Sequence, residues 1–168
     1  MNKITHIEQQ KIWDKEHQNP HVLLQMDAQD PSGGVVRFFD FIKDQKLSDL
    51  LGIEMGCGKG RNVIFLASQK ENKKVYGFDF SPSAIQVAKE RNEKAGVSDK
   101  AGFFVGDATM SWPFDSNLFD YVIDNFASTD IESPGGRKFA IGEIKRVLKS
   151  GVFSCSILLL RMMNFIGR

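Results

Sequence analysis

Short apolar runs alternate with stretches of helical periodicity from about residue 50 onward. The run at 50–55 is nearly continuous, which is typical of a parallel strand covered on both faces. Apolar residues at helical spacing, such as Ala84, Ile85 and Ala88, indicate the intervening helices. The pattern predicts strands at 50–55, 75–78, 102–105, 119–123 and 152–160, and helices at 61–69, 82–95 and 137–149. Because strands alternate with helices, we expect an α/β fold with an open, doubly wound, mainly parallel sheet.

The first 48 residues precede this alternation and carry two further helical patterns. They predict a helix over 4–17, a loop at 30–34 and a helix over 35–46. We expect this segment to cap the ends of the strands. A chain of 168 residues has the length of one domain. The expected organisation is a single domain with a helical cap at 1–48, an α/β core at 49–160 and a tail at 161–168.

Composition and charge narrow the classes of protein to consider. Hydrophobic residues make up 42% of the chain and charged residues 26%, as in folded globular proteins. The net charge of +1 gives no reason to expect a nucleic-acid partner. Cys57 and Cys155 lie far apart in the sequence and suit neither a disulfide framework nor a metal site, so we expect no metal.

We find neither a secretory signal nor a membrane-spanning segment in the sequence. Residues 1–10 are polar and lack the apolar core of a secretory signal. The densest apolar run, at 157–166, is interrupted by Arg161 and Asn164 and falls short of the roughly 20 residues that cross a bilayer. We therefore expect a cytoplasmic protein with no membrane partner.

Glycines and acidic residues gather where the predicted strands end. In open α/β sheets, ligands bind outside the carboxyl ends of the strands. Three glycines follow the first strand, at positions 56, 58 and 60, and would let the backbone approach a ligand closely. Acidic residues close or follow four strands: Glu54, Asp79, Asp107 and Asp124. Because a carboxylate such as Asp79 can accept both hydroxyls of a ribose, these residues predict a nucleoside-containing cofactor.

The glycine spacing and the acidic residues bear on which cofactor binds. A dinucleotide fingerprint needs its third glycine at position 61, where this chain has Arg61, and Gly60 comes one residue early. The four acidic residues would also repel a diphosphate. A cationic ligand such as an adenosyl sulfonium fits them better, because it needs hydrogen-bond acceptors and tolerance of positive charge.

At these residues the sequence resembles the class I S-adenosylmethionine-dependent methyltransferases. Residues 53–60 look like the family's E/D-x-G-x-G-x-G motif, and 75–81 look like its second strand with the ribose-binding acid. The family's later motifs are matched by three further segments of this chain: 106–108, 119–124 and 143–151. Five motifs in order cover about residues 50–155. The resemblance implies a Rossmann-like methyltransferase fold and methyl transfer from S-adenosylmethionine to a small-molecule or protein acceptor that the sequence does not identify.

The resemblance also implies a cofactor site, although it identifies no catalytic residue. The backbone of Gly56, Cys57 and Gly58 would lie against the methionine portion, with Glu54 as the acid of that motif. Asp79 would bind the ribose, and Phe80 would pack on the adenine. The remaining implied contacts are Asp107 to the adenine amino group with Ala108 beside it, and Asp124 and Asn125 near the transferred methyl.

The C-terminal part of the sequence departs from the family pattern in two ways. The turn at 148–152 has one glycine and no proline, where the family usually has Leu-Lys-Pro-Gly-Gly. Family members usually continue with a helix and an antiparallel hairpin, whereas this sequence stops at Arg168. The expectation is thus a fold that lacks the C-terminal hairpin. The apolar edge at 153–160 would then either pair with another chain, as in a homodimer, or expose the core and destabilise the fold.

Two other functions stay open at this point. A nicotinamide (NAD(P))-dependent oxidoreductase would use a similar fold, although the glycine spacing and the acids disfavour it. A cofactor-binding or interaction module without activity is the other alternative. Among the aromatic residues, Trp112, Phe114 and Phe126 are interpreted as packing residues. Three residues near the N-terminus suit either a lid over the site or a structural role: Trp13, His17 and His21.

Overall fold

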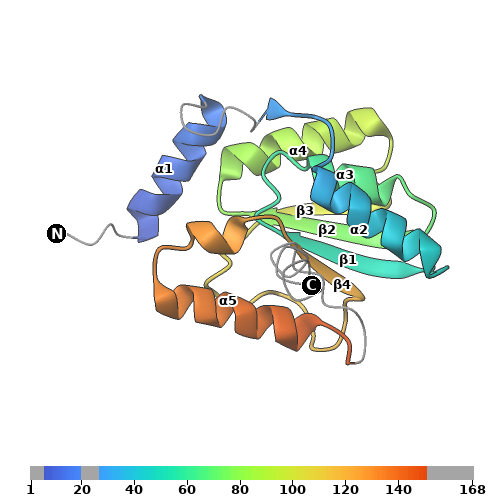
Figure 1. Ribbon diagram of the computed structural model, residues 1–168. Helices are drawn as coiled ribbons and strands as arrows, with labels where there is room; N and C mark the ends of the chain where they lie inside the picture. Colours follow the sequence, from blue (N-terminus) through green and yellow to red (C-terminus); the bar gives the residue numbers. More distant parts are fainter. Residues whose placement is uncertain (1–5, 20–26, 151–168) are drawn as a thin grey trace, which may run out of the picture.

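The computed structural model describes residues 6–19 and 27–150 (Figure 1). Its helices and strands alternate after the first two helices, as the apolar pattern predicts. The predicted strand at 152–160, with the edge expected to pair in a homodimer, lies outside the described residues. The elements are α1 (His6–Gln18), α2 (Gly33–Asp44), β1 (Leu50–Met55), α3 (Arg61–Ala67), β2 (Asn72–Asp79), α4 (Pro82–Ala95), β3 (Ala101–Val105), β4 (Tyr121–Asp124), the 3-10 helix η2 (Ala127–Asp130) and α5 (Pro134–Val147).

The described strands form one parallel sheet in the order β3-β2-β1-β4. The chain runs outward from β1 to β2 and β3, and then crosses back to place β4 on the other side of β1. The strand order therefore reverses between β1 and β4, which is the topological switch point where such sheets bind ligands. This arrangement confirms the predicted doubly wound α/β fold.

Side chains that alternate along the strands divide the core between the two faces of the sheet. On one face, Val75 and Ile123 pack with apolar residues of α2, α3 and α4. On the other face, Ile53 and Val122 pack with α5. Figure 1 shows the same layers, with α2, α3 and α4 on one side of the sheet and α5 on the other. The strands are apolar on both faces because helices cover both faces.

Local capping residues decide where several helices begin and end. Helix α4 has the predicted bounds, because Ser81 caps its start and Gly96, in the left-handed conformation, ends it. Helix α5 starts at Pro134, three residues earlier than predicted, because the Ser133 hydroxyl accepts a hydrogen bond from the Gly136 N–H. Helix α2 likewise starts earlier, at Gly33, within the predicted loop at 30–34.

The other bounds differ by a few residues. Helix α3 ends at Ala67, two residues before its predicted end. Strand β2 is longer at its start than the predicted 75–78. Strand β4 begins at Tyr121, because Phe119 instead forms an isolated parallel bridge with Leu148.

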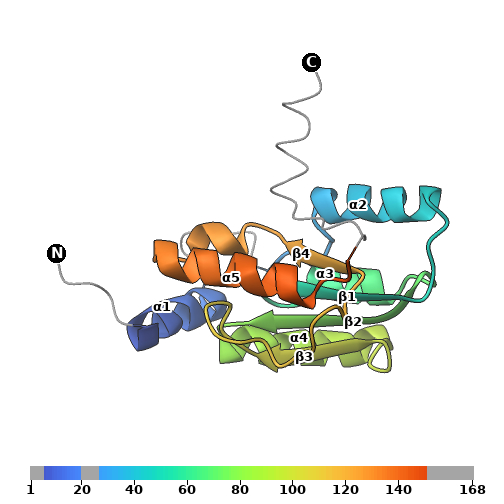
Figure 2. The same cartoon turned by 90° about the horizontal axis from the view of Figure 1, so that it is seen from below.

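The two N-terminal helices occupy different places. Helix α1 lies at the end of the sheet toward which the strands run (Figure 2). Its Asp14 carboxylate accepts hydrogen bonds from the Ser81 hydroxyl (2.6 Å) and the Ser83 N–H (2.9 Å), and Gln10 donates to the Phe80 carbonyl (3.0 Å). Helix α2, by contrast, packs on a face of the sheet through buried apolar residues. Within the segment expected to cap the strand ends, α1 is therefore the helix that lies there.

Candidate functional site

A cavity of about 770 Å³ lies at the carboxyl ends of the strands, next to the switch point. Its volume falls in the range of small-molecule sites, roughly 300–1,000 Å³. Every site residue predicted from the sequence lines this cavity except Asp124. The predicted residues on its wall are Glu54, Gly56, Cys57, Gly58, Asp79, Phe80, Asp107, Ala108 and Asn125.

The glycine loop between β1 and α3 forms one wall of the cavity. Gly56 has φ +66°, and a Cβ atom there would lie 2.4 Å from the Cβ atom of Ala127. Gly58 has φ +52°, and a Cβ atom there would lie 3.3 Å from the His17 ring. Both positions combine a left-handed backbone with a close neighbour, so glycine is required at each. The glycines therefore let η2 and α1 approach the loop.

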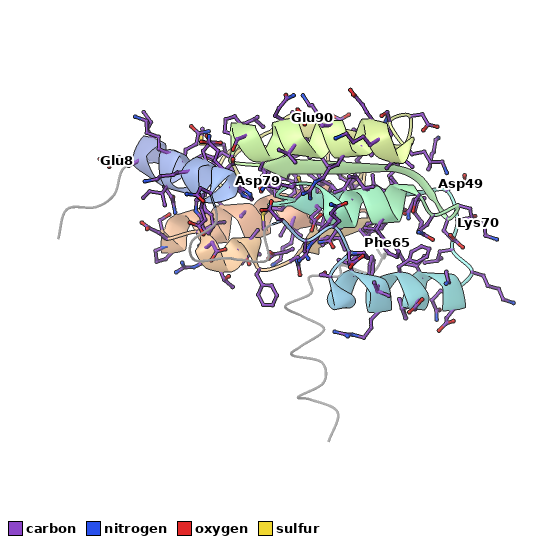
Figure 3. The ribbon with its side chains drawn as sticks, turned by 90° about the horizontal axis from the view of Figure 1, so that it is seen from above. Glu8, Asp49, Phe65, Lys70, Asp79 and Glu90 are labelled. Atoms are coloured by element: carbon purple, nitrogen blue, oxygen red, sulfur yellow. The ribbon has the colours of Figure 1, made fainter. Side chains whose placement is uncertain are left out.

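Asp79 ends β2 and joins three elements around the cavity. Its Oδ2 accepts a hydrogen bond from the Gly58 N–H (2.8 Å), and its Oδ1 accepts one from the Ser81 N–H (2.9 Å). The His17 Nε2 atom on α1 lies 3.9 Å from Oδ1. Figure 3 shows Asp79 where α1, α3 and α4 come together. A carboxylate has about four acceptor positions, so this one retains capacity for a ligand's hydroxyl groups.

Glu54 is a buried carboxyl on the cavity wall, with 1% of its surface exposed. Its Oε1 accepts a hydrogen bond from Asn62 Nδ2 (2.7 Å), whereas its Oε2 has no hydrogen-bond partner among the described residues. Burial raises the pKa of Glu54 to about 8; the Asn62 hydrogen bond and Arg61 oppose this rise, and Asp79 adds to it. An unpaired buried carboxyl oxygen suits a ligand that brings a positive charge or a hydrogen-bond donor.

Asp107, Ala108 and Phe80 line the cavity from the loops after β3 and β2. The Asp107 Oδ1 atom accepts hydrogen bonds from the Thr109 N–H and hydroxyl, both at 2.8 Å. These two bonds hold the carboxyl group at the end of β3. The wall of the cavity here combines one oriented carboxylate with an aromatic ring, which suits a polar aromatic base.

Asp124 lies behind the cavity wall, although Asn125 beside it lines the cavity. The Asp124 side chain is buried, and its Oδ1 accepts a hydrogen bond from the Ser128 N–H (3.1 Å). Its carboxylate thus caps η2, which follows Phe126 in the left-handed conformation (φ +74°). The hydrogen bond to Ser128 gives this carboxylate a local structural role, and its predicted place near the transferred methyl group stays a prediction.

Two groups of residues on the wall were not included in the site predicted from the sequence. Trp13 and His17 of α1 line the cavity, and burial lowers the pKa of His17 against the opposing effect of Asp79. Asn62 is buried and bonds to Glu54. The sequence does contain a signal for Asn62: it is a polar residue at an inward position of the helix that directly follows the glycine loop.

The structure also shows the surroundings of Cys57 and of the three aromatic residues that were interpreted as packing residues. Burial raises the pKa of the Cys57 thiol well above its usual range, which favours the neutral thiol. Trp112 packs on Phe78, with ring centroids 4.8 Å apart, and Phe114 packs on Phe119 at 4.9 Å. These two aromatic residues are packing residues, as interpreted. Phe126 is half exposed and lines the cavity.

The described ranges, 6–19 and 27–150, contain neither a cluster of metal-ligating side chains nor a membrane-spanning helix. No group of three or more His, Cys, Asp or Glu side chains there is arranged to hold a metal ion. None of the helices in those ranges has both the length and the apolar character needed to cross a membrane.

Comparison with known proteins places these features in a family. The sequence pattern of a family described as "Methyltransferase domain" matches residues 53–151. Demethylmenaquinone methyltransferase of Staphylococcus epidermidis is 31% identical over 152 residues, which cover 90% of this chain and 51% of that protein. Release factor glutamine methyltransferase of Dictyoglomus turgidum is 37% identical over 73 residues, which cover 44% of this chain and 26% of that protein.

The structural comparison agrees on the fold. A putative S-adenosyl-L-methionine-dependent methyltransferase from Methanococcus maripaludis superposes with a TM-score of 0.63 at 20% identity, over 93% of this chain and 64% of that one. At this identity the likeness concerns the fold alone. The chain spans about half, or less, of the length of the curated relatives it matches.

Proposed function

This chain belongs to the methyltransferase domain family, and from that membership we propose that it transfers a methyl group from S-adenosylmethionine to an acceptor molecule. One observation carries the proposal. Asp79, Glu54 and the glycine loop converge on a single cavity at the switch point of the sheet. The unpaired Oε2 of Glu54 suits a cationic cofactor better than a diphosphate.

The donor set of the cavity fits the parts of this cofactor. In our proposal Asp79 accepts the ribose hydroxyls while it keeps its bonds to Gly58 and Ser81. Glu54 faces the methionine ammonium group through its unpaired oxygen. Asp107 accepts from the adenine amino group, with Phe80 against the ring. Asn125 and η2 border the region in which the acceptor would approach.

The sulfonium group of the cofactor supplies an electrophilic methyl group when it is bound. The residues of the chain bind and orient it, and they keep water away from the reacting atoms. Trp13 and His17 of α1 line the cavity, and in our proposal they help to exclude water from it. At neutral pH the raised pKa of Glu54 keeps a proton on the free protein, and a nearby ammonium group favours its release. No residue of the chain is assigned as a catalytic base.

The acceptor stays open in this proposal. The two curated relatives compared above are named for different acceptors, demethylmenaquinone and a glutamine of release factor. An amine, carboxylate, hydroxyl or thiol could each accept the methyl group from a cofactor bound in the same site. The oxidoreductase alternative is not favoured, because Arg61 stands where the third glycine of a dinucleotide site belongs. The cytoplasm remains the location expected from the sequence.

Methyl transfer itself provides the test. The chain is incubated with S-adenosylmethionine and acceptors of each nucleophile class, and S-adenosylhomocysteine is quantified. The proposal expects product that depends on one acceptor class and on Asp79. Cofactor binding without product from any class would contradict transferase activity and favour the non-catalytic binding module.

A further inference from the structure

The amide of Asn62 joins three elements beneath the cavity. Asn62 is the second residue of α3, and only 3% of its surface is exposed. Its Nδ2 donates to Glu54 Oε1 at 2.7 Å, and its Oδ1 accepts from the Ser32 N–H at 2.8 Å. Ser32 is the capping residue of α2. One side chain therefore connects the end of β1 with the start of α2.

The two contacts leave the amide a single orientation. The Ser32 N–H is a donor and must face the amide oxygen, so the amide nitrogen must face Glu54. In the described part of the chain, Asn62 is the one hydrogen-bond partner of the Glu54 carboxyl group. Because Oε1 is held by this bond, Oε2 is the buried oxygen left without a partner, and a ligand that engages Glu54 would bind it there.

Further contacts hold the segment before α2 near the same place. Lys59 forms an ion pair with Asp27, and Arg61 donates to the Asp30 carbonyl (3.3 Å). In the ion pair the Lys59 side chain is 9% exposed and its Asp27 partner is 62% exposed, and the Arg61 contact is at an exposed position. The contact between Asn62 and Ser32 is partly buried, and it is the one of the three whose side chain also reaches the buried Glu54 carboxyl group. Residues 30–33 of this segment line the cavity.

We propose that Asn62 is a positioning residue for cofactor binding, which orients Glu54 in the cavity wall and couples that carboxyl group to Ser32 at the start of α2. The inference rests on the proposed function, since it assigns Glu54 to the cofactor. A ligand that engages Glu54 then also stabilises the wall formed by residues 30–33. Asn62 itself touches no reacting atom.

The charge on Glu54 depends on its whole surroundings. The Asn62 hydrogen bond and the Arg61 charge favour the ionised carboxylate, whereas burial and the charges of Asp79 and Asp124 oppose it. Two further titratable groups feel the Glu54 charge: Cys57 and Tyr121. Removing the Asn62 donor therefore leaves Arg61 as the main influence that favours ionisation.

The substitution Asn62→Asp tests the proposal, because it keeps an acceptor for Ser32 and removes the donor to Glu54. The control is Asn72→Asp, another buried asparagine, whose amide donates to the Leu66 carbonyl (2.9 Å) and accepts from the Tyr121 hydroxyl (2.8 Å) outside the cavity. Two readouts are needed: the titration midpoint of the Glu54 carboxyl by carbon NMR without ligand, and the affinity for S-adenosylhomocysteine from about pH 6 to pH 9.

The expected results separate the two variants. Asn62→Asp raises the Glu54 midpoint by about one pH unit or more and weakens binding at about pH 8 by roughly tenfold, which is the same free-energy difference. Asn72→Asp lowers the melting temperature and leaves both readouts unchanged. If Asn62→Asp does not fold, Glu54→Gln is added to it. In this double variant the amide at position 54 donates to the carboxylate at position 62, so the hydrogen bond is restored with donor and acceptor exchanged. We expect the double variant to fold and to bind S-adenosylhomocysteine no more tightly than Glu54→Gln alone.

Other results would overturn the proposal. An unchanged Glu54 midpoint in Asn62→Asp means that Asn62 does not control Glu54. Recovery of full affinity in the reversed pair means that the position of the carboxylate is irrelevant. If the unsubstituted chain does not bind S-adenosylhomocysteine, the proposed function fails, and the Glu54 midpoint measured without ligand still decides whether Asn62 orients Glu54.

Discussion

Replacing Glu54 by Gln should stabilise the folded chain at alkaline pH while it weakens cofactor binding. The carboxyl group is buried beside Asn62, and its Oε2 has no partner in the described part of the chain. Glutamine has nearly the same shape and keeps an oxygen for the Asn62 amide. The substitution therefore removes the buried charge and leaves the packing of β1 against α3 largely intact.

The magnitude follows from the pKa of Glu54, which burial raises from its ordinary value of 4.5 to about 8. Between these two values the folded chain holds a proton that the unfolded chain has released. The free energy of unfolding therefore falls as pH rises through that window, by about 5 kcal/mol at most. Glutamine titrates nowhere in this range, and its unpaired amide costs about 1–3 kcal/mol. Above pH 8 the variant should be more stable by roughly 2–4 kcal/mol.

Urea denaturation from about pH 5 to pH 9 measures the effect. The difference in free energy of unfolding between the variant and the parent should grow in favour of the variant as pH rises through the window. The affinity for S-adenosylhomocysteine should fall by about tenfold at the same pH values, because the carboxylate no longer faces the ammonium group. A difference in stability that does not vary with pH would refute the buried-charge reasoning.

Three further predictions follow from other contacts. Asp79→Asn keeps one acceptor for the backbone, so the chain should fold and bind S-adenosylhomocysteine about tenfold more weakly by calorimetry; unchanged affinity would refute the ribose assignment. Gly60→Ala sets a methyl group 2.9 Å from the Phe103 ring at φ +82°, so urea denaturation should show a loss of about 2–4 kcal/mol. Ser133→Ala removes the cap that accepts from Gly136 and should cost about 1 kcal/mol in the same assay, whereas Ser133→Asp should not.

Features encoded by neighbouring residues were predictable from the sequence. Ser81, Pro82 and Gly96 mark both ends of α4, and the structure confirms these bounds. The cavity likewise forms where the strands end, because parallel strands bring their carboxyl ends to one edge of the sheet. The predicted start of α5 was wrong by three residues. Pro134 and the two glycines after it are typical of a loop, and only the cap formed by Ser133 shows that the helix begins there.

Features that depend on distant residues were not predictable. The role of Asn62 requires Ser32, which lies thirty positions earlier and approaches only when α2 packs on the sheet. Asp79 also accepts a hydrogen bond from the Gly58 N–H, which lies 21 positions earlier and which no local pattern reveals.

The central claim is that the cavity at the switch point binds the adenosyl cofactor. The most direct measurement is the thermal unfolding of the chain with S-adenosylhomocysteine and, separately, with NAD. At about 100 times its Kd a ligand stabilises by about 2.7 kcal/mol, and each kcal/mol raises Tm by roughly 2–4 °C at this size. We predict a rise of several degrees with S-adenosylhomocysteine and none with NAD. A cooperatively melting chain that responds to neither, or to NAD alone, would contradict the account.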